Sequence, residues 1–336
     1  MKKSVSKILA VMMSVILLVC AFASCAKDGE NKDVLKIGVI QFMEHNALDA
    51  AYKGFVDELE QKGYSEKKGN LKINYNNAQG EQANCVTIAD QLASSDCDLI
   101  LAIATPAAQA VANKIKDIPI LVTAITDAAF SGLVTSNENP GGNVSGTSDL
   151  NPISDQIDLL EKLAPGVKNV GLFYCSSEDN SKFQVDVAAK EMKSRGISTQ
   201  EFTVTSQNEI QSVVESMAGK VDAIYIGTDN MLASGMATVS DAATKLKLPV
   251  IVGESGMVEN GGLATYGINY TNLGAQTANM AIDILVNGKE ISTMAIQYQD
   301  KEKSELAVNT KTAQAIGVTI PEDILSKAAV YPESAK

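Results

Sequence analysis

The only histidine of this 336-residue chain lies in a short stretch whose residue types could do chemistry. His45 stands between Glu44 and Asn46, with Asp49 close behind, directly after the apolar run 35–40. An imidazole beside carboxylates is the pairing that general-base catalysis uses. The same turn would serve equally well as one side of a ligand-binding cleft. The rest of the chain has to decide between these two interpretations.

A catalytic interpretation finds little support elsewhere in the sequence. A Ser-His-Asp triad would depend on His45, and the nearest approach to a Gly-x-Ser-x-Gly motif, at 253–257, has Met257 in place of the second glycine. No Gly-x-x-x-x-Gly-Lys phosphate loop occurs, and paired carboxylates for glycoside chemistry stay open at Asp229 and Glu254. The cysteines beyond residue 25 lack zinc-type spacing. We therefore expect no enzyme, no metal site and no cofactor.

The N-terminus predicts export. Lysines at positions 2, 3 and 7 precede the apolar run 8–23, which is too short for a stable spanning helix and is typical of a signal peptide. Small residues before Cys25 resemble a bacterial lipoprotein box, although Phe22 stands where leucine is usual. We expect a signal peptide at 1–24 and a lipidated tether at 25–34, with Cys25 anchoring the protein to the outer side of the cytoplasmic membrane. A plain signal peptide is the alternative.

The charge of the expected mature chain limits its partners. Loss of 1–24 leaves 25 basic against 40 acidic residues, a net charge of −15. Such a surface repels nucleic acid and anionic lipid headgroups. About 300 residues suit one large or two medium-sized domains. We therefore expect neither nucleic acid nor anionic lipid as a partner.

Strands and helices alternate along the chain, and the alternation occurs twice. The first series runs from the strand 37–40 to the strand 119–124, and the second from the strand 170–174 to the strand 249–253. Gly38 matches Gly171 and Pro119 matches Pro249 at nearly constant offsets. Apolar strands that alternate with helices indicate parallel sheets buried on both faces. The fold class is therefore α/β, with two Rossmann-like lobes and a hinge that the chain crosses more than once.

Short polar residues follow the predicted strands of both lobes. In open α/β sheets the carboxyl ends of the strands border the ligand crevice. As single residues these groups are also good helix caps, but together they would equip one groove for a small zwitterion, with hydroxyls and helix N-termini for its carboxylate and acids for its ammonium. The residues that support this site are Gln41, Thr105, Asp127, Asn180, Asp229 and Glu254.

Several longer blocks make the chain similar to a known family. The segments "EHNALDAAYKGF", "LAIATPAAQA", "NPGGNVSGTS" and "VGESGMVENGGLATYGINY" resemble the TrpX-like substrate-binding proteins of ABC importers, a branch of the type I periplasmic-binding-protein superfamily. The resemblance runs from about residue 35 to 321. It implies two lobes with three hinge crossings, which we place so that 35–148 plus 269–296 form the N-terminal lobe and 149–268 plus 297–336 the C-terminal lobe. It also implies an ABC permease and its ATPase as partners, and we expect a monomer.

The resemblance implies cleft residues and a ligand class. Carried over position by position, the cleft residues are Gln41, Glu44, Thr105, Asp127, Tyr174, Asn180, Ser181, Asp229 and Glu254. Members of the branch are associated with aromatic amino acids, so we expect capture of tryptophan, tyrosine or phenylalanine by closure of the two lobes. The segment "FYCSSEDNS" departs from the common pattern at the cleft. A sugar or nucleoside receptor of the same fold, and a ligand sensor without transport, remain alternatives.

Overall fold

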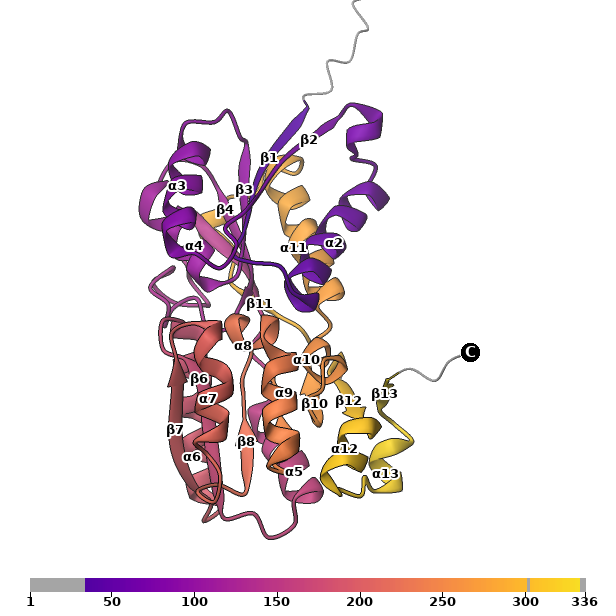
Figure 1. The fold of residues 1–336 in the computed structure, drawn as a ribbon. Coiled ribbons are helices and arrows are strands. Elements are labelled where there is room, and N and C mark those ends of the chain that lie inside the picture. The colour runs from indigo at the N-terminus through magenta and orange to yellow at the C-terminus, as the bar shows by residue number, and fades with distance from the viewer. Residues whose placement is uncertain (1–33, 301–302, 333–336) are drawn as a thin grey trace, which may run out of the picture. The chain divides into compact units, whose positions relative to one another are not determined.

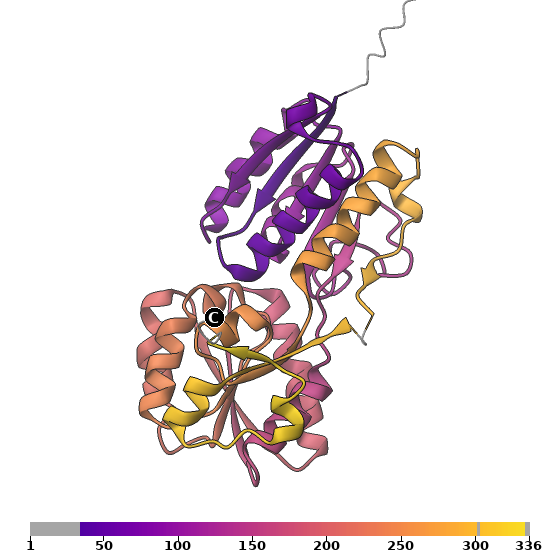
Figure 2. The same ribbon diagram turned by 90° about the vertical axis from the view of Figure 1, so that its right-hand side faces the viewer.

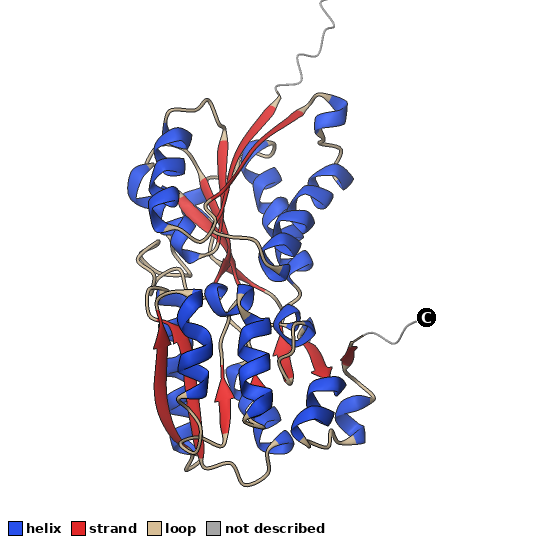
Figure 3. Ribbon diagram, in the orientation of Figure 1, coloured by secondary structure: helices blue, strands red, loops and turns tan. Residues whose placement is uncertain are grey.

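The computed structural model describes residues 34–300 and 303–332. The expected signal peptide, Cys25 and most of the tether lie outside these residues. The described chain contains two sheets, each flanked by helices (Figure 3). The expected fold class, two α/β lobes with mostly parallel strands, is confirmed.

The first sheet is parallel throughout and its central strands are buried. Its strand order is β11 (Gln297–Tyr298), β5 (Val144–Ser148), β4 (Ile120–Ile125), β3 (Leu99–Ile103), β1 (Leu35–Gln41) and β2 (Leu71–Asn77). Helices α2 (Asn46–Gln61) and α11 (Tyr270–Leu285) cover one face, and α3 (Gln82–Ala93) and α4 (Thr105–Lys114) cover the other (Figure 1). Side chains of β3 and β4 point into both helical layers, which explains their unbroken apolar sequence.

The second sheet repeats this order and extends it. The order is β7 (Ser198–Val204), β6 (Asn169–Cys175), β8 (Ala223–Tyr225), β9 (Val250–Ile251), β10 (Ala264–Gly267), β12 (Glu305–Asn309) and β13 (Ala329–Tyr331). The sequence β7-β6-β8-β9-β10 matches β2-β1-β3-β4-β5, so the predicted duplication of topology is confirmed. Strand β12 runs antiparallel to β10, and β12 and β13 were not among the predicted strands.

Two apolar clusters lie against the second sheet. Val170, Leu172 and Tyr174 of β6 belong to one cluster, while Phe173 and Cys175 belong to the other, as side-chain alternation along a strand requires. The first cluster includes residues of α5 (Ile153–Leu163), α6 (Asp179–Ser194), α12 (Thr310–Ile316) and α13 (Glu322–Leu325). The second includes residues of α7 (Ile210–Glu215), α8 (Asn230–Ser234), α9 (Met236–Lys245) and α10 (Ser255–Glu259). Short 3₁₀ turns occur at Glu66–Lys68, Gln207–Glu209 and Ile291–Thr293.

The chain passes between the two sheets after β5, after β10 and again after β11. The last passage lies beyond Tyr298, because β11 pairs with β5 in the first sheet, whereas the sequence placed this boundary between 296 and 297. The first and second passages are joined by the Tyr270 hydroxyl, which donates to Asp149 Oδ2 at 2.8 Å. The Thr126 hydroxyl, which follows β4, donates to Asp149 Oδ1 at 3.1 Å. All three residues are buried, so these bonds connect the two passages with each other and with the end of β4.

Helices α2 and α11 pack through glycine. A Cβ atom on Gly54 would lie 2.0 Å from the carbonyl oxygen of Thr271, and one on Gly274 would lie 1.9 Å from that of Ala51. The two helices lie side by side in Figures 1 and 2. Because α2 begins directly after the His45 turn and α11 begins at the hinge, this close packing ties the turn to the hinge.

Candidate ligand-binding site at the strand ends

The first lobe brings three predicted strand ends together. Gln41, the last residue of β1, pairs in register with Ile103, the last residue of β3, and Thr105 follows two residues later. Ala104 between them has φ 79° and ψ 151°, a conformation that costs an L-residue free energy and occurs mainly at functional sites. Gln41 and Thr105 are therefore neighbours at the edge of the sheet, and both are buried.

Glu44 and Asp127 are also at this edge but have partners within their own lobe. Glu44 is exposed and accepts a hydrogen bond from the Asn77 amide at 3.3 Å. Asp127 accepts from the Phe130 backbone N–H at 2.8 Å and from the Asn137 amide at 3.1 Å. The geometry thus gives Asp127 the role of stabilising the loop after β4.

In the second lobe, Asn180, Ser181 and Asp229 form one buried cluster with Glu178. Asp229 accepts from the Cys175 N–H at 2.6 Å and caps α8 by accepting from Leu232 N–H at 2.8 Å. Glu178 accepts from the Asn230 amide, from the backbone N–H groups of Asn230 and Met231, and from the Asn180 amide. Burial and the neighbouring Asp229 raise the pKa of Glu178 to about 8.

Glu254 and Tyr174 occupy different surroundings. Glu254 caps α10 by accepting from the N–H groups of Gly256 and Met257, and burial raises its pKa to about 7. The Tyr174 side chain lies in the apolar cluster of α5 and α6, and its hydroxyl donates to Glu201 Oε2 at 2.6 Å. The structure therefore does not bring Tyr174 together with the other candidate residues, because its position on β6 directs it to one face of the sheet.

Side chains from both lobes meet directly at these strand ends. His45 Nε2 lies 3.1 Å from Asn230 Oδ1. The Gln184 amide donates to the Thr126 hydroxyl at 2.9 Å, and also to Thr228 in its own lobe. Three further contacts bridge the lobes: Asn46 to Glu259 at 2.8 Å, Gln109 to Asp179 at 2.8 Å, and the rings of Phe130 and Phe183 at 4.9 Å.

Most of these bridging residues were not among the predicted site residues. Asn230 and Thr126 do follow predicted strands, and that signal could have added them to the site. Gln184 lies inside a helix, and nothing in the sequence reveals that its amide reaches the other lobe. Its role depends on tertiary structure.

The buried acidic and basic groups around the site are all acids, and burial raises the pKa of each. Asp149, Glu178, Asp229 and Glu254 are buried, and among the described residues no lysine or arginine is. Arg195 is the single arginine of the chain, and it binds Asp158, Glu161 and Glu191 between α5 and α6. A positive group on a ligand would interact favourably with these buried acids in their charged form. No described arginine is placed to bind a ligand carboxylate.

Several buried polar atoms at the strand ends have no hydrogen-bond partner. They are Gln41 Oε1, His45 Nδ1, Thr105 Oγ1 and Asn180 Oδ1. Buried polar atoms in folded proteins are almost always paired, so unpaired atoms need an explanation. These four come from the facing strand ends of both lobes, where a small polar ligand would supply their partners.

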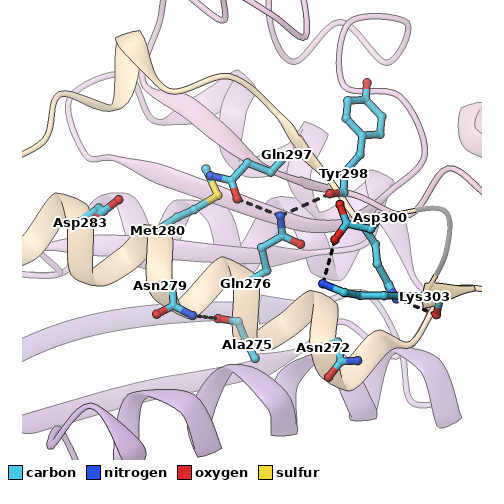
Figure 4. A pocket seen from close by; sticks show the side chains of 11 residues that line it. Asn272, Ala275, Gln276, Asn279, Met280, Asp283, Gln297, Tyr298, Asp300 and Lys303 are labelled. Carbon is cyan, nitrogen blue, oxygen red and sulfur yellow. Dashed lines mark hydrogen bonds and ion pairs between the residues drawn. The ribbon is translucent and has the colours of Figure 1, made fainter.

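Two hollows of the surface are other candidates for a binding site. One of about 190 Å³ lies between the lobes, where Asn46, Glu254, Gly256 and Tyr270 are among its lining residues. A larger one of about 460 Å³ lies between α11 and the segment after β11 (Figure 4). Polar groups of the larger hollow are paired with one another: the Gln276 amide donates to Gln297 Oε1 at 2.9 Å, and Lys303 pairs with Asp300 at 2.8 Å. The strand-end cluster, with its unpaired atoms, is the better candidate site.

Comparison with known proteins identifies the family. The model of the family described as ABC transporter substrate binding protein matches residues 36–331. The chain belongs to this family. A tyrosine-binding protein of Clostridioides difficile is 39% identical over 321 residues, which cover 92% of each chain. The family consists of substrate-binding proteins, as the sequence predicted.

Two solved structures of relatives bear on the arrangement of the lobes. The chain is 40% identical to an ABC domain from Streptococcus pneumoniae in complex with L-Trp, with 88% of this chain and 99% of that chain covered and a TM-score of 0.84. It is 42% identical to a substrate-binding protein of Clostridium difficile in its ligand-free, open structure, with the same coverage but a TM-score of 0.68. The structure of this chain is therefore more similar overall to that of the relative in complex with L-Trp than to the ligand-free, open one.

Among residues 34–300 and 303–332, no helix has the length and apolar character needed to cross a membrane. No group of three or more His, Cys, Asp or Glu side chains in the same residues is arranged to hold a metal ion.

Proposed function

We propose that this protein is the substrate-binding component of an ABC importer and captures an aromatic amino acid between its two lobes. The observation that carries the proposal is the set of unpaired buried polar atoms at the facing strand ends, three of which are acceptors in our assignment of the hydrogen bonds. An amino acid presents an ammonium group with three N–H donors, and the buried carboxylates around the site favour a positive charge.

The carboxylate of the ligand needs donors other than arginine. The Thr105 hydroxyl lies at the N-terminus of α4, where N–H groups and the helix dipole favour an anion. The relatives with printed ligands, a tyrosine-binding protein and a domain complexed with L-Trp, support an aromatic side chain on the ligand. The site has no catalytic role in this proposal.

The place of the protein and its partners follow from the same proposal. The mature chain would be held at the extracytoplasmic face of the cytoplasmic membrane through lipid on Cys25, and would pass its ligand to a permease driven by an ATPase. It would act as a monomer. Replacement of Cys25 by alanine should release the protein from the membrane fraction, as immunoblotting of fractionated cells would measure. Continued retention of the variant in membranes would contradict the lipid anchor.

Ligand screening tests the binding proposal directly. Thermal unfolding of residues 26–336 would be followed with L-tyrosine, L-tryptophan, L-phenylalanine, myo-inositol, ribose and a ribonucleoside. We expect an upward shift of the melting temperature with at least one aromatic amino acid, because a ligand that binds only the folded state stabilises it. A shift with ribose, inositol or the nucleoside alone would replace the amino acid by the sugar or nucleoside alternative.

A further inference from the structure

His45 occupies the N-cap position of α2 but does not cap the helix. Its backbone is extended, with φ −166° and ψ 164°, and its side chain makes no hydrogen bond to the first turn. Asparagine, aspartate, serine and threonine are the residues that satisfy the free N–H groups at this position. The imidazole is therefore available for another interaction.

The partners of His45 determine which ring nitrogen carries the proton. Asn230 donates an amide N–H to the carboxylate of Glu178, which also accepts backbone N–H groups from Asn230 and Met231. In the structure the amide nitrogen of Asn230 lies against Glu178 Oε2, and its amide oxygen lies against His45. Nε2 of His45, 3.1 Å from this oxygen, is then the protonated nitrogen.

The second ring nitrogen is consequently an acceptor. In a neutral imidazole with the proton on Nε2, Nδ1 carries a lone pair. Burial lowers the pKa of His45 and outweighs both the bond to Asn230 and the negative charge of Asp49, so the ring is neutral at neutral pH. Nδ1 is buried and has no partner in the structure.

Two more acceptors accompany Nδ1. The Gln41 amide nitrogen donates to Met43 O at 2.8 Å and to Asp49 Oδ1 at 2.6 Å, which leaves Oε1 buried without a donor. The Asn180 amide nitrogen faces Glu178, Ser181 and Thr228 O, which leaves its Oδ1 likewise unpaired. Two of these three buried acceptors belong to the first lobe and one to the second.

We propose that His45 is a specificity-determining residue of the site, whose Nδ1 accepts a hydrogen bond from the ammonium group of the bound amino acid while Nε2 binds Asn230 of the other lobe. This inference rests on the proposed function and names the group that recognises the ammonium. It also makes His45 a link between ligand binding and closure, because one ring contacts the ligand and the opposite lobe.

Two conservative substitutions at His45 distinguish the roles of its two ring nitrogens. His45→Gln places an amide donor near the position of Nε2 and removes the acceptor at Nδ1. His45→Asn places an amide oxygen near Nδ1 and removes the contact with Asn230. Isothermal titration would measure the affinity of each variant for L-tyrosine and for 3-(4-hydroxyphenyl)propionate, which lacks only the ammonium group. Thermal unfolding of the unliganded variants would show that both fold.

We expect wild-type protein to prefer L-tyrosine over the propionate by at least about 100-fold, and His45→Gln to reduce this preference by about tenfold. His45→Asn should keep most of the preference and lose affinity for both ligands alike, because only closure is weakened. An unchanged preference in His45→Gln would overturn the inference. If wild-type protein binds no aromatic amino acid at all, the proposed function fails first and this inference falls with it.

Measuring affinity at several pH values adds a further test, because a histidine with a purely structural role would not change the pH dependence of ligand binding. Protonation of Nδ1 would replace the acceptor by a donor and oppose the ammonium, so wild-type affinity for L-tyrosine should fall towards acidic pH. Asp49 on α2 and Glu178 and Asp229 on the second lobe face this region and also influence the profile. The ratio of affinities between wild type and His45→Gln isolates the histidine, and it should approach one at low pH. A ratio that stays constant from about pH 5 to pH 8 would contradict the inference.

Discussion

Polar residues at the strand ends of this protein either cap helices or present an unpaired group, and their hydrogen bonds show which of the two each residue does. Asp229 and Glu254 use both carboxylate oxygens on backbone N–H groups, so they hold helices α8 and α10 in place. Thr105 stands at the start of α4 with its hydroxyl unpaired, and nothing in the described fold uses that group. The capping residues shape the site, while the unpaired groups are the ones left for a ligand.

Replacement of Thr105 by valine tests this distinction. Valine has nearly the same shape and lacks only the hydroxyl. We expect the free energy of unfolding to be unchanged or slightly higher, because no hydrogen bond is lost, and ligand affinity to fall about tenfold, as for loss of one net hydrogen bond of about 1.5 kcal/mol. Chemical denaturation and calorimetric titration would measure the two quantities.

Thr265→Val is the matched control for this substitution. Thr265 also has a buried, unpaired hydroxyl, but it lies within β10 of the second sheet. The Thr265→Val substitution should leave both the free energy of unfolding and the ligand affinity nearly unchanged. A Thr105→Val protein that binds as well as wild type would remove Thr105 from the site.

The buried carboxylate of Glu254 should make stability depend on pH. Its pKa rises from 4.5 to about 7 on folding, so the folded state holds more protons than the unfolded state between these values. Stability due to this group is therefore complete below about pH 4.5 and is lost as the pH rises through 7. Glu254→Gln keeps one oxygen for the helix cap and removes the charge.

We expect the melting temperature of Glu254→Gln to change less than that of wild type between about pH 5 and pH 8. From the lower to the upper end, the difference in stability between variant and wild type should move in favour of the variant by on the order of 1–3 kcal/mol. Differential scanning calorimetry at several pH values would measure the profile. Glu60→Gln, which changes an exposed carboxylate on α2, is the control; equal slopes in all three proteins would refute the prediction.

For single residues, the sequence predicted the position in the fold better than it predicted the hydrogen-bond partners. Gln41, Thr105, Asn180, Asp229 and Glu254 follow apolar strand runs, so their place at a sheet edge could be predicted from the chain alone. Their roles could not, because a cap and a ligand-binding group are the same residue types. His45 and Asn230 lie 185 positions apart in the sequence, so their interaction depends on how the lobes meet.

At the scale of elements, hydrophobic patterning predicted the strands, and less regular segments were missed. Helix α5 lies between the two predicted series of strands and helices and was not predicted, although its apolar residues at 153, 157, 160 and 163 have helical spacing. The return of β11 to the first sheet rests on two residues, which is too short for a sequence pattern. The close approach of α2 and α11 depends on two glycines far apart in sequence, and only the fold brings them together.

Replacement of Gly274 by alanine should separate α2 from α11. Alanine normally favours a helix over glycine by about 1 kcal/mol, so the intrinsic effect would stabilise the protein. Here the added Cβ would lie 1.9 Å from a backbone oxygen that cannot move independently. We expect a net loss of about 2–4 kcal/mol in the free energy of unfolding, because overpacking must shift a helix.

Chemical denaturation would measure this loss, with Asn272→Ala as the control. Asn272 lies on the same helix with an exposed side chain, and its replacement should change stability by less than about 0.5 kcal/mol. Ligand affinity of Gly274→Ala should also fall, since α2 carries the His45 turn. A variant as stable as wild type would show that the two helices accommodate the methyl group.

At the scale of the whole molecule, the contacts between the lobes in residues 34–300 and 303–332 define a closed state, and their loss would give an open state. The bridges His45 to Asn230, Thr126 to Gln184 and Asn46 to Glu259 are polar, so water can replace each of them when the lobes separate. The rings of Phe130 and Phe183 form an apolar contact between the lobes, in which the Phe130 side chain remains 53% exposed. A ligand that bonds to both lobes would therefore decide the balance between the two states.

We accordingly expect the ligand-free protein in solution to populate an open arrangement and an aromatic amino acid to close it. Single-molecule energy transfer between dyes at Asn113 and Lys190, exposed residues on α4 and α6, would report the separation of the lobes after Cys97 is replaced by serine. Ligand should shift the population to the shorter distance in proportion to its preference for the closed state. Dyes at Asn113 and Lys53, both in the first lobe, are the control and should not respond. A cross-lobe distance that stays at the closed value without ligand would show that the bridging hydrogen bonds suffice for closure, and that ligand binding has to proceed through local opening of the strand-end turns instead.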